Sequence, residues 1–205
     1  MIVVVDYGMG NVGSIANMLR KVGATAAVSA DAATIEAAEK LILPGVGAFD
    51  AAMERINATG MRALLERRAL EDRVPVLGIC LGMQLLTQSS EEGTLAGLGW
   101  LAARTLAFRG RVDPGLKVPH MGWNLVALHT PSALTVGLDT LEEPRFYFVH
   151  SYFVACEDAS TAILRTTYGV SYDSAVQSDN IYGVQFHPEK SHRFGMRLLE
   201  NFARL

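Results

Sequence analysis

A cysteine framed by two glycines is the feature of this sequence with the clearest chemical meaning. Cys80 stands in Gly-Ile-Cys-Leu-Gly at 78–82, after a strand-like apolar run and before a stretch with helical spacing. This pattern is the nucleophile elbow of many hydrolases, with cysteine in place of serine. The tight turn strains the nucleophile's backbone, and small neighbours let strand and helix approach. The helix start favours a thiolate and directs the backbone N–H of Leu81 at a developing oxyanion.

A histidine that could act as the base for this cysteine lies near the other end of the chain. His187 and Glu189 belong to Gln-Phe-His-Pro-Glu at 185–189, which follows a β-rich run. Residues two apart on a strand share a face, so Glu189 can orient one nitrogen of His187 while the other accepts the thiol proton. The sequence therefore predicts a Cys80–His187–Glu189 triad.

The alternatives to a triad are less specific. Cys80 could be a buried core cysteine, and His-Pro-Glu could be a surface turn. His187, Glu189 and His192 could hold a metal, but their spacing matches no familiar zinc signature. We expect neither a metal nor another cofactor.

Two glycine-rich turns could lie beside the elbow. Pro-Gly-Val-Gly at 44–47 follows a predicted strand, so the amide between Val46 and Gly47 could be the second oxyanion donor unless the loop is an ordinary tight connection. Gly-x-Gly-x-x-Gly at 8–13, with Asp31 downstream, matches a dinucleotide-binding fingerprint. Asp6 precedes its first glycine and would repel a pyrophosphate. We expect this turn to present Asn11 at the carboxyl edge of the sheet.

Other polar residues are weaker candidates. Gln84 lies one helical turn after Cys80 and could hydrogen-bond a polar substrate, although a helix interior also tolerates glutamine. His-Ser-Tyr at 150–152 lies in the most aromatic β-run and could line a pocket. Cys156 is expected to be inert, and His120 and His129 are expected to be ordinary loop or sheet-edge histidines.

The elements that must position these residues follow from the spacing of apolar side chains. The first half alternates short apolar runs with helical periodicity, which predicts an open, mostly parallel, doubly wound α/β sheet flanked by helices. Its predicted strands cover 2–5, 25–28, 41–43 and 74–79. One predicted helix begins at Ser14, a second runs from Asp31 to Glu39, helical patterns follow the glycine loop as far as Glu71, and a last helix covers 81–88.

The second half is richer in strands and predicts antiparallel additions to the sheet. The expected strands cover 100–108, 125–129, 146–154, 162–167 and 182–186. We expect loops over 113–119 and 131–135, and a closing helix over 191–203.

The composition fits one globular domain over 1–205, because 50% of the residues are hydrophobic and 19% are charged. The net charge of −3 lacks the basic excess that nucleic acid requires. Two cysteines cannot form a disulfide framework, which indicates a reducing compartment. The N-terminus does not match a signal peptide, and no apolar run reaches the roughly 20 residues of a membrane span. We expect a cytoplasmic protein with no nucleic-acid or membrane partner.

The motifs together resemble a known family. Gly-Ile-Cys-Leu-Gly-Met-Gln at 78–84 and His-Pro-Glu at 187–189 are similar to the class I, or triad, glutamine amidotransferases. Further blocks are similar to the glutaminase subunits of imidazole glycerol phosphate synthases, enzymes of histidine biosynthesis, and cover 6–11, 44–49, 119–124, 146–152 and 185–191. The resemblance therefore runs over nearly the whole chain.

The resemblance implies a reaction. Cys80 would attack the carboxamide carbon of L-glutamine, His187 would protonate the departing ammonia, and water would release glutamate from the thioester. The expected oxyanion donors are Leu81, Val46 and Gly47, and the expected glutamine contacts are Gln84, Ser151 and Tyr152. The residues alone leave open another triad amidotransferase, a γ-glutamyl hydrolase, or a non-catalytic regulatory subunit.

The resemblance also implies a partner. In the family, ammonia passes through a channel into a (β/α)8-barrel cyclase subunit, so a heterodimer is expected. Residues implied at or near its interface are Asn11, Trp123, Tyr147 and Lys190. Because an unpartnered glutaminase would waste glutamine, we expect the loop at 45–47 to rest with its amide turned away, until the loaded partner switches it through Asn11 and 120–124.

Overall fold

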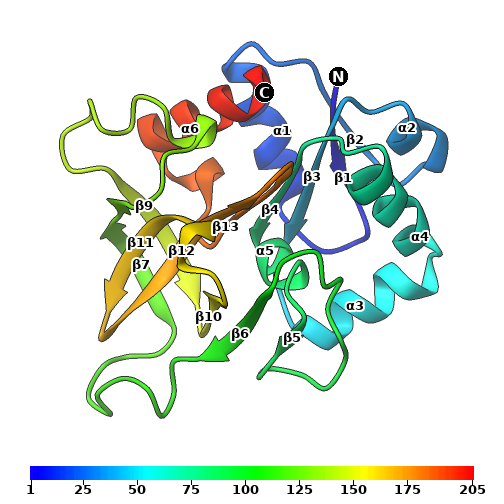
Figure 1. Ribbon diagram of the computed structural model, residues 1–205. Coiled ribbons are helices and arrows are strands. Elements are labelled where there is room, and N and C mark those ends of the chain that lie inside the picture. The colour runs from blue at the N-terminus through cyan, green and yellow to red at the C-terminus, as the bar shows by residue number, and fades with distance from the viewer.

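The computed structural model describes residues 1–205 and contains an eleven-stranded sheet with helices on both faces (Figure 1). Five parallel strands form one half of it in the order β2-β1-β3-β4-β13, with β2 at the edge. They are β1 (Ile2–Val5), β2 (Ala26–Ser29), β3 (Lys40–Gly45), β4 (Val76–Cys80) and β13 (Ile181–Val184). The helices are α1 (Val12–Lys21), α2 (Ala32–Glu36), α3 (Phe49–Ala58), α4 (Met61–Glu66), a π-helical turn at Arg67–Glu71, α5 (Leu81–Leu85) and α6 (His192–Arg204).

Burial on both faces explains why the parallel strands are continuously apolar. In β1, Ile2 and Val4 belong to the core beneath α1 and α6, whereas Val3 and Val5 belong to the core beneath α3 and α4. Successive side chains of a strand point to opposite faces, so a strand covered on both sides must be apolar at every position. The predicted open, mostly parallel α/β sheet is confirmed.

Antiparallel strands extend the sheet beyond β13, as expected. Next to β13 come β12 (Val170–Ser178), β10 (Tyr152–Cys156) and β6 (Ala103–Ala107), and the short β5 (Ser89–Ser90) runs parallel to β6. Strand β11 (Ala162–Tyr168) pairs with β12 and with β8 (Ala127–Leu128). The apolar pattern of the sequence does not predict β12. Polar residues interrupt the apolar pattern of this strand. One of them, Asp173, is buried, where it accepts a hydrogen bond from the backbone N–H of Cys156 and pairs with Arg165.

The prediction of one strand over 146–154 is wrong. The chain divides at Ser151 into β9 (Arg145–His150), which pairs with β7 (His120–Leu125) as a separate two-stranded ribbon, and β10, which belongs to the large sheet. Phe146, Phe148 and His150 point inward from β9, and Phe153 and Val154 are buried in β10. Both halves are therefore apolar enough to look like one strand, and only Ser151 separates them.

Most other differences concern the ends of elements. Helix α1 begins at Val12, α2 stops at Glu36 and α5 stops at Leu85. The predicted strand at 125–129 is the end of β7 plus the short β8, and the expected loop at 131–135 includes a 3-10 turn at Ala133–Thr135. Two more 3-10 turns cover Ala159–Thr161 and Pro188–Lys190. The closing helix α6 confirms the prediction over 191–203.

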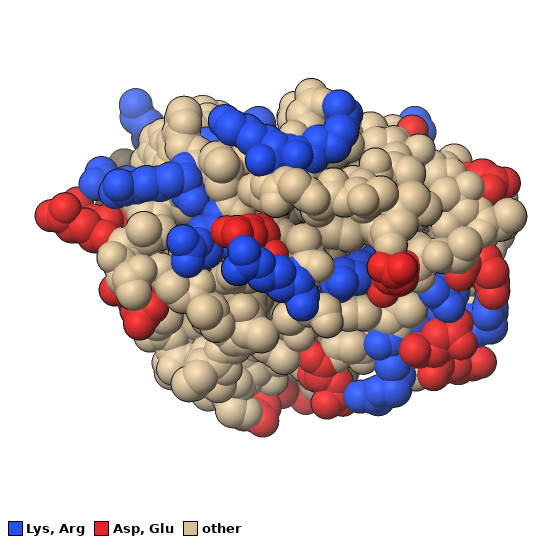
Figure 2. Space-filling model, turned by 90° about the horizontal axis from the view of Figure 1, so that it is seen from above, with Lys and Arg blue, Asp and Glu red and all other residues tan.

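The two chain ends lie together at the amino edge of the parallel strands (Figure 1). Seen from that edge, basic and acidic side chains are both scattered over the surface with other residues between them (Figure 2). No helix is long and apolar enough to cross a membrane.

Candidate active site

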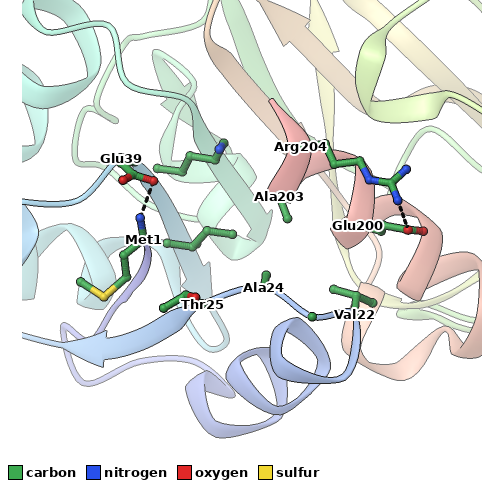
Figure 3. Close-up of a pocket in the computed structure, with 11 residues that line it drawn as sticks. Met1, Val22, Ala24, Thr25, Glu39, Glu200, Ala203 and Arg204 are labelled. Carbon is green, nitrogen blue, oxygen red and sulfur yellow. Dashed lines mark hydrogen bonds and ion pairs between the residues drawn. The ribbon is translucent and has the colours of Figure 1, made fainter.

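Two cavities of equal size, each about 340 Å³, lie at opposite edges of the sheet. The one at the amino edge lies between the two termini and carries two ion pairs, the Met1 ammonium with Glu39 and Arg204 with Glu200 (Figure 3). Lys40 also lines it. The one at the carboxyl edge contains a thiol and an imidazole. Because the volumes are the same, the chemistry of the lining selects the second cavity as the candidate active site.

The carboxyl-edge cavity brings together segments far apart in the sequence. It contains the elbow, the glycine loop, the His-Ser-Tyr segment and His187 from the His-Pro-Glu motif. Its lining residues are Val46, Gly47, Cys80, Leu81, Gln84, Glu92, Pro119, Val149, His150, Ser151, Tyr152, His187 and Lys190. Parallel strands end at this edge, which is where open α/β sheets place their ligands.

Cys80 ends β4 on the strained turn that the sequence predicts. Its φ is 56° and its ψ is −110°, a region that costs a non-glycine residue free energy and recurs at catalytic turns. The turn is possible because α5 approaches β3 closely: a Cβ at Gly82 would lie 1.8 Å from the carbonyl oxygen of Leu43. The sulfur is nearly buried, with Cys80 7% exposed.

His187 and Glu189 form a buried ion pair beside this turn. Nδ1 of His187 lies 2.9 Å from Oε1 of Glu189, and the two side chains are 2% and 1% exposed. Burial alone would lower the pKa of His187, but interactions with Cys80 and Glu189 outweigh burial and raise the pKa to about 9. Its Nε2 is buried without a regular hydrogen bond, so this nitrogen is available for proton transfer with the sulfur.

The glycine loop lines the same cavity through Val46 and Gly47. Gly47 has a φ of 110°, and Val46 is 44% exposed. The loop is anchored where it leaves β3, because the Tyr7 hydroxyl donates a 2.6 Å hydrogen bond to the carbonyl oxygen of Pro44. A dinucleotide site would need Asp31 as the acid that binds the ribose. The Asp31 carboxylate instead accepts hydrogen bonds from Thr34 and caps α2.

The family model described as glutamine amidotransferase class-I matches residues 3–205. The chain belongs to the class-I glutamine amidotransferase family. Curated relatives of this amidotransferase include "Imidazole glycerol phosphate synthase subunit HisH 2" of Methanococcus maripaludis, which is 52% identical over 100% of this chain and 99% of the relative. A protein of the same name from Pseudomonas aeruginosa is 49% identical over 100% of both chains.

Solved structures agree on the fold of this amidotransferase. A structure described as glutamine amidotransferase superposes with a TM-score of 0.74 at 17% identity over 100% of both chains. A chain of the structure of PurLQS from Thermotoga maritima gives a TM-score of 0.70 at 19% identity, with 99% of this chain and 97% of the other covered. At these identities the likeness concerns the fold alone.

Several residues named from the sequence lie around the cavity of this amidotransferase. Trp123 and Tyr147 face each other across the ribbon, with ring centroids 6.2 Å apart, and the Lys190 ammonium lies 5.7 Å from the Tyr147 ring. Asn11 is exposed at the start of α1, which contacts the turn at 188–190. The His192 ring stacks on Trp123, and no three His, Cys, Asp or Glu side chains are grouped as a metal site would need.

The prediction for His120 is wrong. Its side chain is not at an ordinary edge but is buried, stacked between Phe148 and Tyr168, and burial lowers its pKa to about 4. Exposed Met121 beside it gives no hint of this burial. His129 is exposed, and its backbone N–H pairs with the carbonyl oxygen of Ile163. Cys156 is half-buried, and burial together with Asp173 raises its pKa.

Two residues at the site received no role from the sequence. Glu92 lines the cavity and accepts a hydrogen bond from the backbone N–H of Phe49, and burial raises its pKa. Gln185 is fully buried, and its Nε2 lies 3.8 Å from the Cys80 sulfur. Glu92 stands in no pattern that would single it out. Gln185 begins the Gln-Phe-His-Pro-Glu motif, but only the folded chain brings it to Cys80.

Proposed function

We propose that this chain is the glutaminase subunit of an imidazole glycerol phosphate synthase, which hydrolyses L-glutamine and supplies ammonia to a cyclase subunit in histidine biosynthesis. The observation that carries the proposal is the meeting of Cys80 with the His187–Glu189 pair in one cavity. The names of relatives matched from end to end support the choice of partner enzyme.

The chemistry follows from the arrangement of the triad. The Cys80 sulfur attacks the carboxamide carbon of glutamine, and the protonated His187 gives its Nε2 proton to the nitrogen as the C–N bond breaks and ammonia leaves. Water then attacks the thioester while His187 accepts a proton from it. The C–S bond breaks, and glutamate and the free cysteine are released. Glu189 keeps the imidazole oriented through Nδ1 and stabilises its charge.

The polar groups of the cavity suit the ends of the substrate. Glutamine carries an ammonium and a carboxylate at its α-carbon, and Glu92 is the acidic residue in the lining. We assign the α-ammonium to Glu92, and other polar contacts of glutamine to Gln84 and to the backbone at Ser151 and Tyr152. The backbone N–H of Leu81 and the Val46–Gly47 peptide are the proposed donors to the oxyanion.

The partner in this proposal is a (β/α)8-barrel cyclase that binds at the mouth of the cavity. The exposed Trp123 and the neighbouring Tyr147 and Lys190 form one surface there, and Asn11 lies at the start of α1, which contacts the same turn. Residues 1–205 act as one amidotransferase domain. A cytoplasmic location is part of the proposal, because a thiol nucleophile must stay reduced.

The test is glutamate release from glutamine by the purified chain, alone and with the cyclase plus its nucleotide substrate. Cys80→Ala serves as the blank. We expect strong stimulation by the loaded partner and no release in the blank. Full activity without a partner would instead indicate a free-standing γ-glutamyl hydrolase, and no release in any mixture would indicate a non-catalytic regulatory subunit.

A further inference from the structure

Gln185 reaches the nucleophile from the neighbouring strand. It directly follows β13, whose Val184 pairs with Ile79 of β4, so the register sets Gln185 beside Cys80. Its backbone N–H donates to the carbonyl oxygen of Ser174, which holds the residue in the sheet beyond the end of β13. The side chain is fully buried. A glutamine at this depth must satisfy both ends of its carboxamide inside the protein.

Both ends of this carboxamide have partners. Nε2 of Gln185 lies 3.8 Å from Sγ of Cys80, within the range of a hydrogen bond to sulfur. Oε1 of Gln185 accepts a hydrogen bond of 3.1 Å from Nε2 of Gln84. The same nitrogen of Gln84 donates to the carbonyl oxygen of Tyr152, also at 3.1 Å.

These contacts decide which way the Gln185 carboxamide points. The carbonyl oxygen of Tyr152 can only accept, so Gln84 must present its nitrogen to it. The second N–H of that nitrogen then requires an acceptor, which is Oε1 of Gln185. Nε2 of Gln185 is consequently directed at the sulfur. Reversing the Gln185 amide would set two N–H donors against each other and leave Gln84 with an unpaired buried donor.

We propose that Gln185 is a positioning residue that donates an N–H to the Cys80 sulfur and favours its thiolate form. A donor stabilises an anionic acceptor more than a neutral one, so the contact favours the thiolate over the thiol. The same contact limits rotation of the sulfur away from His187. The inference rests on the proposed role of Cys80 as nucleophile, and it adds a residue outside the triad that prepares the sulfur before substrate arrives.

The test compares the pH dependence of Cys80 alkylation by iodoacetamide in the wild type and in Gln185→Glu. Glutamate keeps an oxygen for Gln84 but replaces the donor to sulfur with a second oxygen. We expect the alkylation midpoint of Cys80 to rise by about one pH unit, because a charge-assisted hydrogen bond is lost. Peptide mapping separates Cys80 from Cys156, so the midpoint is read for Cys80 alone.

Two further variants complete the design. Gln185→Met removes the donor without adding a charge, so it should raise the midpoint as well, even if Gln185→Glu fails to fold. Gln177→Glu is the matched control, because it places the same charge on β12 at the amino edge, opposite Tyr182, and should leave the midpoint unchanged. An unchanged Cys80 midpoint in a folded Gln185 variant overturns the proposal. The assay uses no glutamine, so its failure is distinct from the failure of glutamate release.

Discussion

His120 Nδ1 lies 3.1 Å from His150 Nε2, across the register pair that joins β7 to β9. The Tyr172 hydroxyl is 3.1 and 3.2 Å from the same two nitrogens. The remaining nitrogen of His150 lies 2.7 Å from the carbonyl oxygen of Tyr152. A buried chain of hydrogen bonds thus connects the ribbon that carries Trp123 to the wall of the cavity that contains Cys80.

This pair should make stability depend on pH. Burial lowers the pKa of His120 to about 4 and that of His150 to about 3, below the ordinary value of 6.5. Between pH 4 and pH 6.5 these histidines are protonated in the unfolded chain but neutral in the folded chain. The free energy of unfolding therefore falls as pH falls from 6.5 toward 4. His120→Asn removes one such site and should flatten the slope by at most about 1.4 kcal/mol per pH unit. Urea unfolding at several pH values measures it, and identical slopes would contradict the assignment.

Loss of the Glu189 charge should disable His187. In Glu189→Gln the imidazole keeps a neighbour of the same shape but loses the carboxylate that helps to raise its pKa to about 9. We expect kcat for glutamate release to fall by about 100-fold or more, the usual contribution of general acid–base catalysis.

The raised pKa of His187 also affects stability in the opposite direction from His120. Its contribution is fully present below pH 6.5 and is lost as pH rises through about 9. In Glu189→Gln the ring should titrate at lower pH, so the contribution should be smaller and its loss complete at lower pH. An NMR titration of the ring follows this change directly. If Glu189→Gln released glutamate at the wild-type rate and its His187 ring titrated at the wild-type pH, the proposed pairing of His187 with Glu189 would be ruled out.

The close approach at the elbow predicts a large effect of one methyl group. In Gly82→Ala the new Cβ would overlap the carbonyl oxygen of Leu43, so strand and helix must separate. Overpacking of this kind costs roughly 1–3 kcal/mol, and both the unfolding free energy and glutamate release should drop. Gly13→Ala is the matched control, because a Cβ at this exposed position of α1 meets nothing within 4 Å. This change should raise the free energy of unfolding by about 0.5–1 kcal/mol. Equal effects of the two changes would refute this explanation.

The loop at 45–47 should be needed for activation by a partner. Gly47 has a φ of 110°, which alanine adopts only with strain, so Gly47→Ala should restrict reorientation of the Val46–Gly47 peptide. We expect stimulation of glutamate release by the loaded cyclase to be abolished while the chain still folds and binds its partner. Stimulation equal to that of the wild type would show that this peptide does not switch.

Local patterns predicted the parts of the site that are local in sequence. The glycines around Cys80 indicate an elbow because strand and helix must touch there, and His187 with Glu189 needs only two-residue spacing. The parallel half of the sheet follows from apolar runs that are covered on both faces. These inferences use neighbours along the chain, which the sequence shows directly.

Features that depend on contacts between distant segments could not be predicted from the sequence. At Ser151 the chain passes from the two-stranded ribbon to the large sheet. The sequence does not show this change, because the aromatic run is buried on both sides of Ser151. His120 is enclosed by Phe148 and Tyr168, which lie far along the chain, so its flanking residues indicated an edge. The role of Gln185 depends on an amide orientation that Gln84 and Tyr152 impose, and no spacing rule contains it.

Covalent labelling decides whether Cys80 is the nucleophile toward glutamine. A diazoketone analogue of glutamine alkylates a nucleophile in a glutamine site, and peptide mass spectrometry locates the modified residue. We predict one label per chain on Cys80, loss of glutamate release in proportion to labelling, protection by glutamine and no label in Cys80→Ala. Labelling at another residue, or full labelling of Cys80 with activity retained, would contradict the mechanism.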